Sequence, residues 1–258
     1  MTYDAGSVSL QGRVLRCRIS DGPKGTLDMD AVRAAASTLA AAGPEVGSVL
    51  IVGGSPNFCT GGDVGAFAAA HDRGALVGEM ARDLHDFVLA LAECPLPVVV
   101  AVSGWAAGAG MSIVCVADVI VGSPDTRFRP AYPSIGFSPD GGMSWTLSRS
   151  IGSARARDMI LMDSVLSGEE ALRAGLLTRL VPTEDVQREA EAVAVALAEG
   201  PTETFARIKR LLADAPGRSL AEHLAAEAES IAACADSPAG REGVDAFVQR
   251  RSAQPSQA

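Results

Sequence analysis

The sequence predicts an α/β fold in which short buried β-strands alternate with helices. The 258-residue chain is 48% hydrophobic but only 4% aromatic, a composition that suits closely packed helices on a sheet of small and β-branched residues. Its length allows one large core, or a core with a smaller appendage. Residues 49–52 and 98–102 are uninterrupted apolar runs, which are typical of strands that are buried on both faces.

Strand and helix patterns alternate along the first half of the chain. The expected strands are residues 14–19, 49–52, 98–103 and 119–121, and the expected helical stretches are residues 28–42 and 65–92. From about Thr183 the pattern is almost wholly helical, with breaks at Pro201 and at Pro216-Gly217. We therefore divide the chain into an α/β core over residues 1–195 and a helical region over residues 196–258.

Charge and cysteine content argue against several classes of protein. With a net charge of −9, the chain is a poor partner for nucleic acid or for an anionic membrane, and an anionic ligand needs local basic groups or backbone amides. The five scattered cysteines lack a CxxC pair, which favours a reducing cytoplasm over a disulfide framework. The three histidines are not at metal-ligand spacing, so we propose no metal site. The longest apolar run is far too short to span a membrane.

Two glycine-rich segments each follow a predicted buried strand. The first covers residues 53–64, and the second covers residues 103–112 and leads into a predicted helix that begins near Ala109. Glycine-rich loops and first-turn amides of a helix present N–H donors that have no internal partner. Taken separately, the first segment could be a plain strand-to-helix turn and the second a site of tight helix packing. Together they could supply two amides for one carbonyl oxygen.

These segments resemble the signatures of the crotonase, or enoyl-CoA hydratase/isomerase, superfamily. The first signature is Phe58-Cys59-Thr60-Gly61-Gly62-Asp63, and the second is Gly104-Trp105-Ala106-Ala107-Gly108-Ala109-Gly110. The resemblance continues, in order, through residues 115–118, 135–142, 166–182 and 242–251. Because it covers nearly the whole chain, it is far more specific than one glycine motif.

The resemblance implies a spiral of ββα units with a C-terminal helical region that packs homotrimers or hexamers. It assigns an oxyanion hole to the backbone amides of Gly62 and Ala109. The substrate would be an acyl-CoA thioester, so coenzyme A arrives as part of the substrate and no separate cofactor is expected. Coenzyme A would be held near Thr60, Gly61 and Gly62, near Lys24 after the first strands, and near Phe247 and Arg250 on the last helix.

The same resemblance bears on which reaction is catalysed. Family hydratases carry two glutamates, at the positions of Ser112 and Tyr132, and neither residue is an evident substitute as acid or base. Asp140 stands where family isomerases often carry an acid. One carboxylate suffices to move a proton along an allylic thioester while the oxyanion hole holds the enolate. We therefore expect Asp140 to be the catalytic base of an enoyl-CoA isomerase.

Three alternatives remain open at this stage. Asp140 could instead cap a turn or the following helix, because Pro-Asp-Gly is a common turn sequence. The chain could be a hydratase with atypical acid and base residues, or an acyl-CoA-binding paralogue without activity.

Asp63 is expected to cap the helix after the first loop, and Cys59 has no nearby base in the sequence that would make it a nucleophile.

Overall fold

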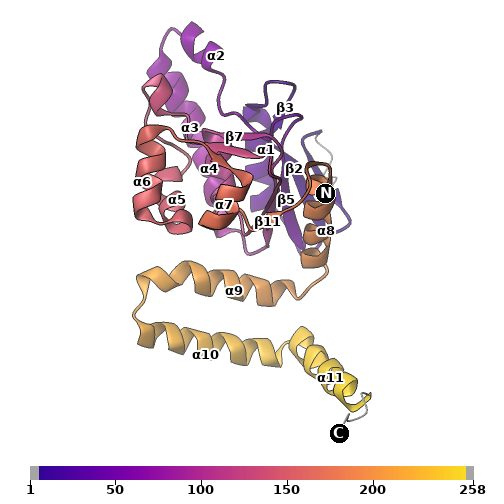
Figure 1. Cartoon of the computed structure of the whole chain (residues 1–258). Helices are drawn as coiled ribbons and strands as arrows, with labels where there is room; N and C mark the ends of the chain where they lie inside the picture. Colours follow the sequence, from indigo (N-terminus) through magenta and orange to yellow (C-terminus); the bar gives the residue numbers. More distant parts are fainter. Residues whose placement is uncertain (1–5, 254–258) are drawn as a thin grey trace. The chain divides into compact units, whose positions relative to one another are not determined.

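The computed structural model describes residues 6–253. The chain forms two compact units, Met1–Glu199 and Gly200–Ala258. The boundary predicted between residues 195 and 196 falls inside helix α8 (Val186–Ala198), all of which belongs to the first unit. The first unit contains the sheets and the glycine-rich loops, and the second consists of helices (Figure 1).

A six-stranded sheet organises the first unit. Its strand order is β1-β2-β5-β6-β8-β11. The β1–β2 pair is antiparallel, and every other neighbouring pair is parallel. The strands are β1 (Val8–Gln11), β2 (Val14–Arg18), β5 (Ser48–Val52), β6 (Val98–Ala101), β8 (Val119–Gly122) and β11 (Arg179–Leu180). The four strands predicted from the sequence are therefore confirmed as β2, β5, β6 and β8.

Both faces of this sheet are buried, which explains the uninterrupted apolar runs. Successive side chains of a strand point to opposite faces. In β5, Leu50 and Val52 belong to a core cluster formed with helix α8, whereas Val49 and Ile51 belong to the cluster formed with helices α1 (Met29–Ala40) and α3 (Arg73–Glu93). Residues 49–52 of β5 therefore all need apolar side chains, whichever face they serve.

The remaining strands form two smaller sheets. One pairs β10 (Leu166–Ser167), β9 (Arg127–Arg129) and β7 (Trp105–Ala107) in that order, and the other is the hairpin of β3 (Ser20–Asp21) and β4 (Thr26–Leu27). After β6 the chain adds β7 and helix α4 (Ala109–Val114), and then β8 and β9 before the next helices. Each of these two turns thus places one strand in each sheet, which is the ββα unit that the family resemblance implies.

Several helices of the first unit begin after a residue whose side chain accepts hydrogen bonds from their first amides. Asp28 caps α1, because its side chain accepts hydrogen bonds from the Asp30 and Ala31 amides. Helix α1 lies within the predicted helical stretch 28–42. The stretch 65–92 is helical as expected, but it is broken into α2 (Val64–Ala69) and α3. The Asp72 side chain accepts a hydrogen bond from Ala75 N–H and starts α3 anew. The other helices of the first unit are α5 (Met143–Ile151), α6 (Ser153–Met162) and α7 (Gly168–Ala174), with short 3-10 turns at Pro133–Ile135 and Thr183–Asp185.

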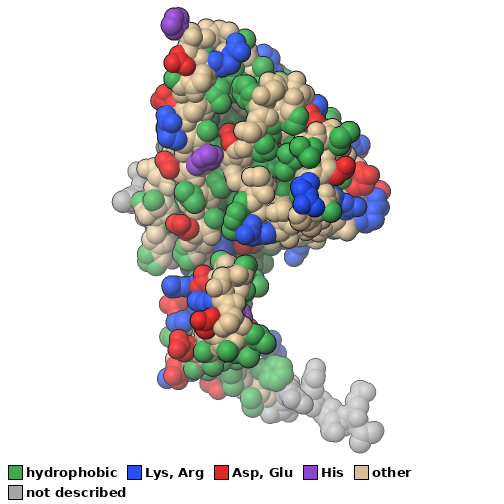
Figure 2. Space-filling view, turned by 90° about the vertical axis from the view of Figure 1, so that its left-hand side faces the viewer, with side chains coloured by type: hydrophobic (Ala, Val, Ile, Leu, Met, Phe, Trp, Pro, Cys, Tyr) green, Lys and Arg blue, Asp and Glu red, His purple; other side chains and the backbone are tan. Residues whose placement is uncertain are grey.

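The second unit confirms the predicted helical C-terminal region. It contains α9 (Thr202–Asp214), a 3-10 turn (Ala215–Gly217), α10 (Leu220–Asp236) and α11 (Pro238–Ala253), with breaks at Pro201 and at Pro216-Gly217 as expected. Charged side chains crowd one edge of these helices in Figure 2, and hydrophobic side chains adjoin them. In the part of the chain that the structure describes, no helix has the length and apolar character needed to cross a membrane.

Candidate active site

The two glycine-rich loops lie side by side because they follow neighbouring parallel strands, β5 and β6. The carboxyl ends of parallel strands meet at one edge of a sheet, which is where ligands commonly bind in α/β folds. Cys59 and Ala106 form an isolated parallel bridge between the loops. Cys59 N–H donates to the Trp105 carbonyl at 3.0 Å, and Ala107 N–H donates to the Cys59 carbonyl at 2.8 Å. These bonds fix the distance between the loops.

Glycine is required where the loops touch. Gly61 has φ +93° and Gly108 has φ +52°, which are conformations that side chains other than glycine rarely adopt. A Cβ on Gly61 would lie 3.7 Å from the Ala109 nitrogen, so the two segments are in van der Waals contact at this point. A Cβ on Gly110 would collide with the Cys59 carbonyl oxygen. The glycines therefore bring the backbones of the two loops together.

Gly62 and Ala109, one from each loop, both line one cavity. Helix α4 begins at Ala109, as the sequence predicts, so that N–H has no partner within the helix. Within residues 6–253, neither amide has a backbone hydrogen-bond partner. Two such N–H groups facing a space from which water can be displaced can hold a developing oxyanion.

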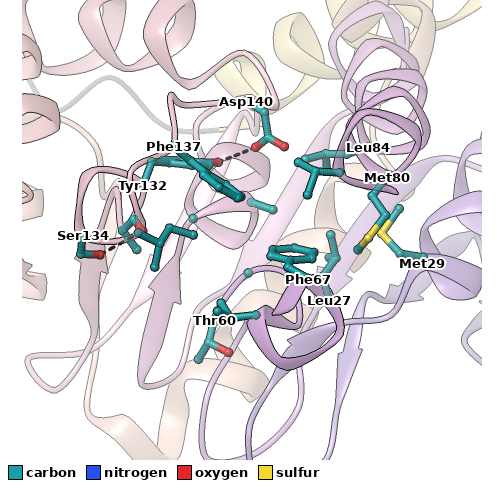
Figure 3. Close-up of a pocket in the computed structure, with 18 residues that line it drawn as sticks. Leu27, Met29, Thr60, Phe67, Met80, Leu84, Tyr132, Ser134, Phe137 and Asp140 are labelled. Carbon is teal, nitrogen blue, oxygen red and sulfur yellow. Dashed lines mark hydrogen bonds between the residues drawn. The ribbon is translucent and has the colours of Figure 1, made fainter. Parts of the chain in front are cut away.

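We call the space beside these amides the inner cavity. Its volume is about 260 Å³, and Figure 3 shows the side chains that surround it. The lining is mainly apolar, and Val77, Met80 and Leu84 contribute one face of α3. Of the described residues that line it, Asp140 alone carries a carboxylate, and none is His, Lys or Arg. The full lining is Leu27, Met29, Thr60, Gly61, Gly62, Val64, Phe67, Val77, Met80, Leu84, Gly108, Ala109, Ala131, Tyr132, Ser134, Ile135, Phe137 and Asp140.

Asp140 is held by a hydrogen-bond network. The Tyr132 hydroxyl donates to Asp140 Oδ1 at 2.6 Å, as drawn in Figure 3. Ser112 Oγ lies 3.2 Å from the same hydroxyl and donates to the Asp140 carbonyl oxygen at 3.0 Å. Burial, together with the neighbouring Asp140 carboxylate, raises the pKa of Tyr132 well above its ordinary value. Tyr132 therefore stays protonated at neutral pH and acts as the donor to Asp140.

The alternative that Asp140 caps the following helix does not match this geometry. Helix α5 is preceded by Gly142, and no side chain accepts a hydrogen bond from its first amides. The Asp140 carboxylate instead points toward the inner cavity (Figure 3). The backbone still turns here, because Met143 N–H donates to the Asp140 carbonyl at 3.2 Å. The turn uses the backbone of Asp140 and leaves its carboxylate for the cavity.

Two other candidates have structural roles. Asp63 caps α2, because its Oδ1 accepts from Gly65 N–H at 2.8 Å and from Ala66 N–H at 3.3 Å, as the sequence predicts. Cys59 is fully buried, and this burial raises the pKa of its thiol to about 12. A thiol with such a pKa carries almost no thiolate at neutral pH. Neither residue is available to react with a ligand in the inner cavity.

The residues assigned to coenzyme A fall into two groups. Thr60, Gly61 and Gly62 line the inner cavity. Lys24 is joined to this group through its backbone, because Thr60 Oγ1 donates to the Lys24 carbonyl at 2.8 Å, while the Lys24 side chain is exposed. Phe247 and Arg250 are exposed residues of α11 in the second unit. The contribution of these two residues to the site therefore stays a prediction.

Sequence reasoning missed two features of this site. It treated Ser112 and Tyr132 only as replacements for glutamates, whereas both contact Asp140. It also did not identify the apolar side chains of α2 and α3 that line the cavity. The spacing of Val77, Met80 and Leu84 was a usable signal, because it places them on one helix face. Within the described residues, no group of three or more His, Cys, Asp or Glu side chains could hold a metal ion.

Comparisons with known proteins agree on one family. The family described as enoyl-CoA hydratase/isomerase matches residues 23–257. A probable enoyl-CoA hydratase of Rhodobacter capsulatus is 36% identical over 208 residues, covering 80% of each chain. The 1,2-epoxyphenylacetyl-CoA isomerase of Escherichia coli is 33% identical over 211 residues, covering 80% of this chain and 79% of the relative. The crystal structure of an enoyl-CoA hydratase from Polaromonas sp. JS666 has a TM-score of 0.88 at 29% identity, covering 94% of this chain and 96% of that one.

Proposed function

The chain belongs to the enoyl-CoA hydratase/isomerase family, and on that premise we propose that it is an enoyl-CoA isomerase that moves a double bond from the 3 to the 2 position of an acyl-CoA thioester. Related enolate rearrangements would use the same groups. One of its relatives is named as an isomerase of an epoxide-bearing phenylacetyl thioester. The pathway would be fatty-acid or aromatic-acid metabolism, in the cytoplasm.

One observation carries this proposal. Among the described residues that line the inner cavity, a single carboxylate, that of Asp140, shares the space with the free amides of Gly62 and Ala109. Hydration of a 2-enoyl thioester needs a group that activates water and a second that supplies the α proton. Ser112 is fully buried and does not line the cavity. An allylic proton shift needs only one group, because the same group removes and returns the proton.

In the proposed reaction, the thioester carbonyl oxygen binds to the Gly62 and Ala109 N–H groups. Asp140 removes a proton from C2 of the 3-enoyl group, and the electron pair of that C–H bond delocalises onto the carbonyl oxygen and C4. Each amide stabilises this dienolate by on the order of 3 kcal/mol. Asp140 then returns its proton to C4, which leaves the double bond between C2 and C3. No water is consumed and no separate cofactor is needed.

Tyr132 positions the base in this scheme. Its hydroxyl is fixed by Ser112 and donates to one oxygen of Asp140. The second carboxylate oxygen is then free to face the acyl carbons. A base whose orientation is fixed before the substrate binds reacts faster, because reorientation does not add to the barrier.

The proposal is tested with matched 2-enoyl and 3-enoyl thioesters and the purified enzyme. We expect the 3-enoyl thioester to be converted to its 2-enoyl isomer. The measurement is the increase in absorbance as the conjugated 2-enoyl product forms. Conversion of neither thioester, with coenzyme A binding intact, would favour the binding paralogue.

Hydration of crotonyl-CoA is expected to be slow or absent. Asp140 is the one carboxylate among the described lining residues, so the lining offers no second carboxylate to complete the addition of water. The measurement is the loss of enoyl absorbance on addition of enzyme. Turnover near the enzyme median of about ten per second would contradict the prediction. Hydratase would then be the better assignment, in agreement with the name of the relative from Rhodobacter capsulatus.

We also propose that the enzyme is a homotrimer or hexamer assembled through the second unit. In the single chain, the large apolar side chains exposed on this unit include Ile208, Leu212, Leu220, Leu224, Ile231 and Val244. Exposed apolar surface of this kind is typical of an interaction site. Light scattering should give three or six times the chain mass of 26.4 kDa. A monomer at micromolar concentration would contradict the proposal. It would also weaken the prediction that Phe247 and Arg250 bind coenzyme A at the site of a neighbouring subunit.

A further inference from the structure

A second cavity, here called the outer cavity, adjoins the inner one. Its volume is about 540 Å³. The two cavities share four lining residues, Val77, Tyr132, Phe137 and Asp140. Thr60, which lies on the side assigned to coenzyme A, and Asp140 are far apart across the inner cavity in Figure 3. An acyl group whose reacting carbons lie at Asp140 can therefore extend into the outer cavity.

The outer cavity differs from the inner one in its charge. Arg73 is the one cationic side chain among the described residues that line either cavity. Its Nε donates to the Phe67 carbonyl at 3.0 Å, which anchors the guanidinium. Within the described part of the chain, no carboxylate forms an ion pair with Arg73. The two Nη groups are therefore left to bind a ligand.

The backbone beside Arg73 also favours an anion. Arg73 and Gly74 are the first residues of α3, a 21-residue helix whose N-terminus carries partial positive charge. Gly74 lines the outer cavity. The nearest acid in the sequence, Asp72, is engaged in capping, because its Oδ1 accepts from Ala75 N–H at 2.9 Å. In a protein of net charge −9, an anionic group needs such a local cluster of donors to bind.

We propose that Arg73 binds a carboxylate at the far end of the acyl group, so that the substrate class is coenzyme A thioesters of unsaturated dicarboxylic acids. This inference rests on the proposed function, because it uses the placement of the acyl carbons at Asp140. An arginine binds a carboxylate with two parallel N–H···O bonds, which a neutral acyl terminus cannot form. The terminus would lie beyond Phe137 and Tyr132, on the α3 side of the outer cavity.

The test compares binding of two unreactive ligands by calorimetric titration. One is a saturated ω-carboxyacyl-CoA, and the other is its methyl ester, which differs only in the terminal charge. The wild-type enzyme is expected to bind the acid roughly 10- to 100-fold more tightly. Arg73→Gln should abolish this preference while leaving the affinity for the ester nearly unchanged. Arg157→Gln, which makes the same change on α6 away from both cavities, should keep the preference.

Two outcomes would overturn the inference. If Arg73→Gln weakens both ligands equally, Arg73 binds the phosphates of coenzyme A instead of the acyl terminus. If the wild type does not prefer the acid, the outer cavity does not select charge. Arg73→Lys keeps the positive charge, so this variant should still bind the acid more tightly than the ester, although by a smaller factor. That result would show that Arg73→Gln loses the preference through its charge and not through misfolding. Failure of the isomerase proposal is read separately, from the turnover of 3-enoyl thioesters.

Discussion

Asp140→Asn is expected to lower the rate of double-bond isomerisation by about 10²- to 10⁴-fold, while the affinity for coenzyme A stays nearly unchanged. The substitution removes the base but keeps the size of the side chain, and its amide oxygen can still accept the Tyr132 hydrogen bond. The proposed oxyanion hole remains, but without the base the dienolate forms much more slowly. The measurement combines turnover of a 3-enoyl thioester with calorimetric titration of a product analogue.

A matched control makes this result specific. Asp28→Asn is the same chemical change at a residue that caps α1 and lines neither cavity, and asparagine also caps helices. Its rate should equal that of the wild type. If Asp140→Asn also kept the wild-type rate, Asp140 would not be the base. The turn formed by its backbone would then be its remaining role, and the binding paralogue would become the better assignment.

Gly110→Ala is expected to lower kcat/KM by about 100-fold or more and to reduce the free energy of unfolding by about 1–3 kcal/mol. The added Cβ would collide with the Cys59 carbonyl oxygen and lie 2.6 Å from the Cys59 Cβ. Cys59 cannot move freely, because it is hydrogen-bonded to the β7 segment at Trp105 and Ala107. The strain should therefore separate the two loops whose Gly62 and Ala109 amides are proposed to form the oxyanion hole.

Whether Gly110→Ala lowers or raises the free energy of unfolding shows whether the contact with Cys59 or helix propensity dominates. Gly110 lies in helix α4 and has no positive φ, so propensity alone predicts that alanine stabilises the helix by about 1 kcal/mol. Gly243→Ala is the control, because Gly243 lies in helix α11 and the added Cβ would meet no atom within 4 Å beyond its chain neighbours and the backbone of its own helix. We expect a slightly higher melting temperature for Gly243→Ala and a lower one for Gly110→Ala. A stabilised, fully active Gly110→Ala enzyme would show that the loops can adjust.

The local pattern of the sequence was sufficient for most of the fold. The apolar runs of β5 and β6 identified strands buried on both faces, and the start of α4 at Ala109 followed from the glycines before it. Capping by Asp63 could also be predicted, because an N-cap bond joins residues two or three positions apart. The break between α2 and α3 was missed although its cap, Asp72, is equally local, since the helical periodicity on both sides hid it.

The sequence by itself determined the class of fold and the two loops, and its resemblance to a known family singled out Asp140, which lines the inner cavity. Only the tertiary structure decided that Tyr132 donates to Asp140, that Ser112 is buried outside the inner cavity, and that Arg73 and Asp140 both line the outer cavity. Strands, turns and caps depend on neighbours within a few residues, so a linear pattern contains them. A contact between α3 and the segment around Asp140 depends on how every intervening element packs, and no local pattern specifies that distance.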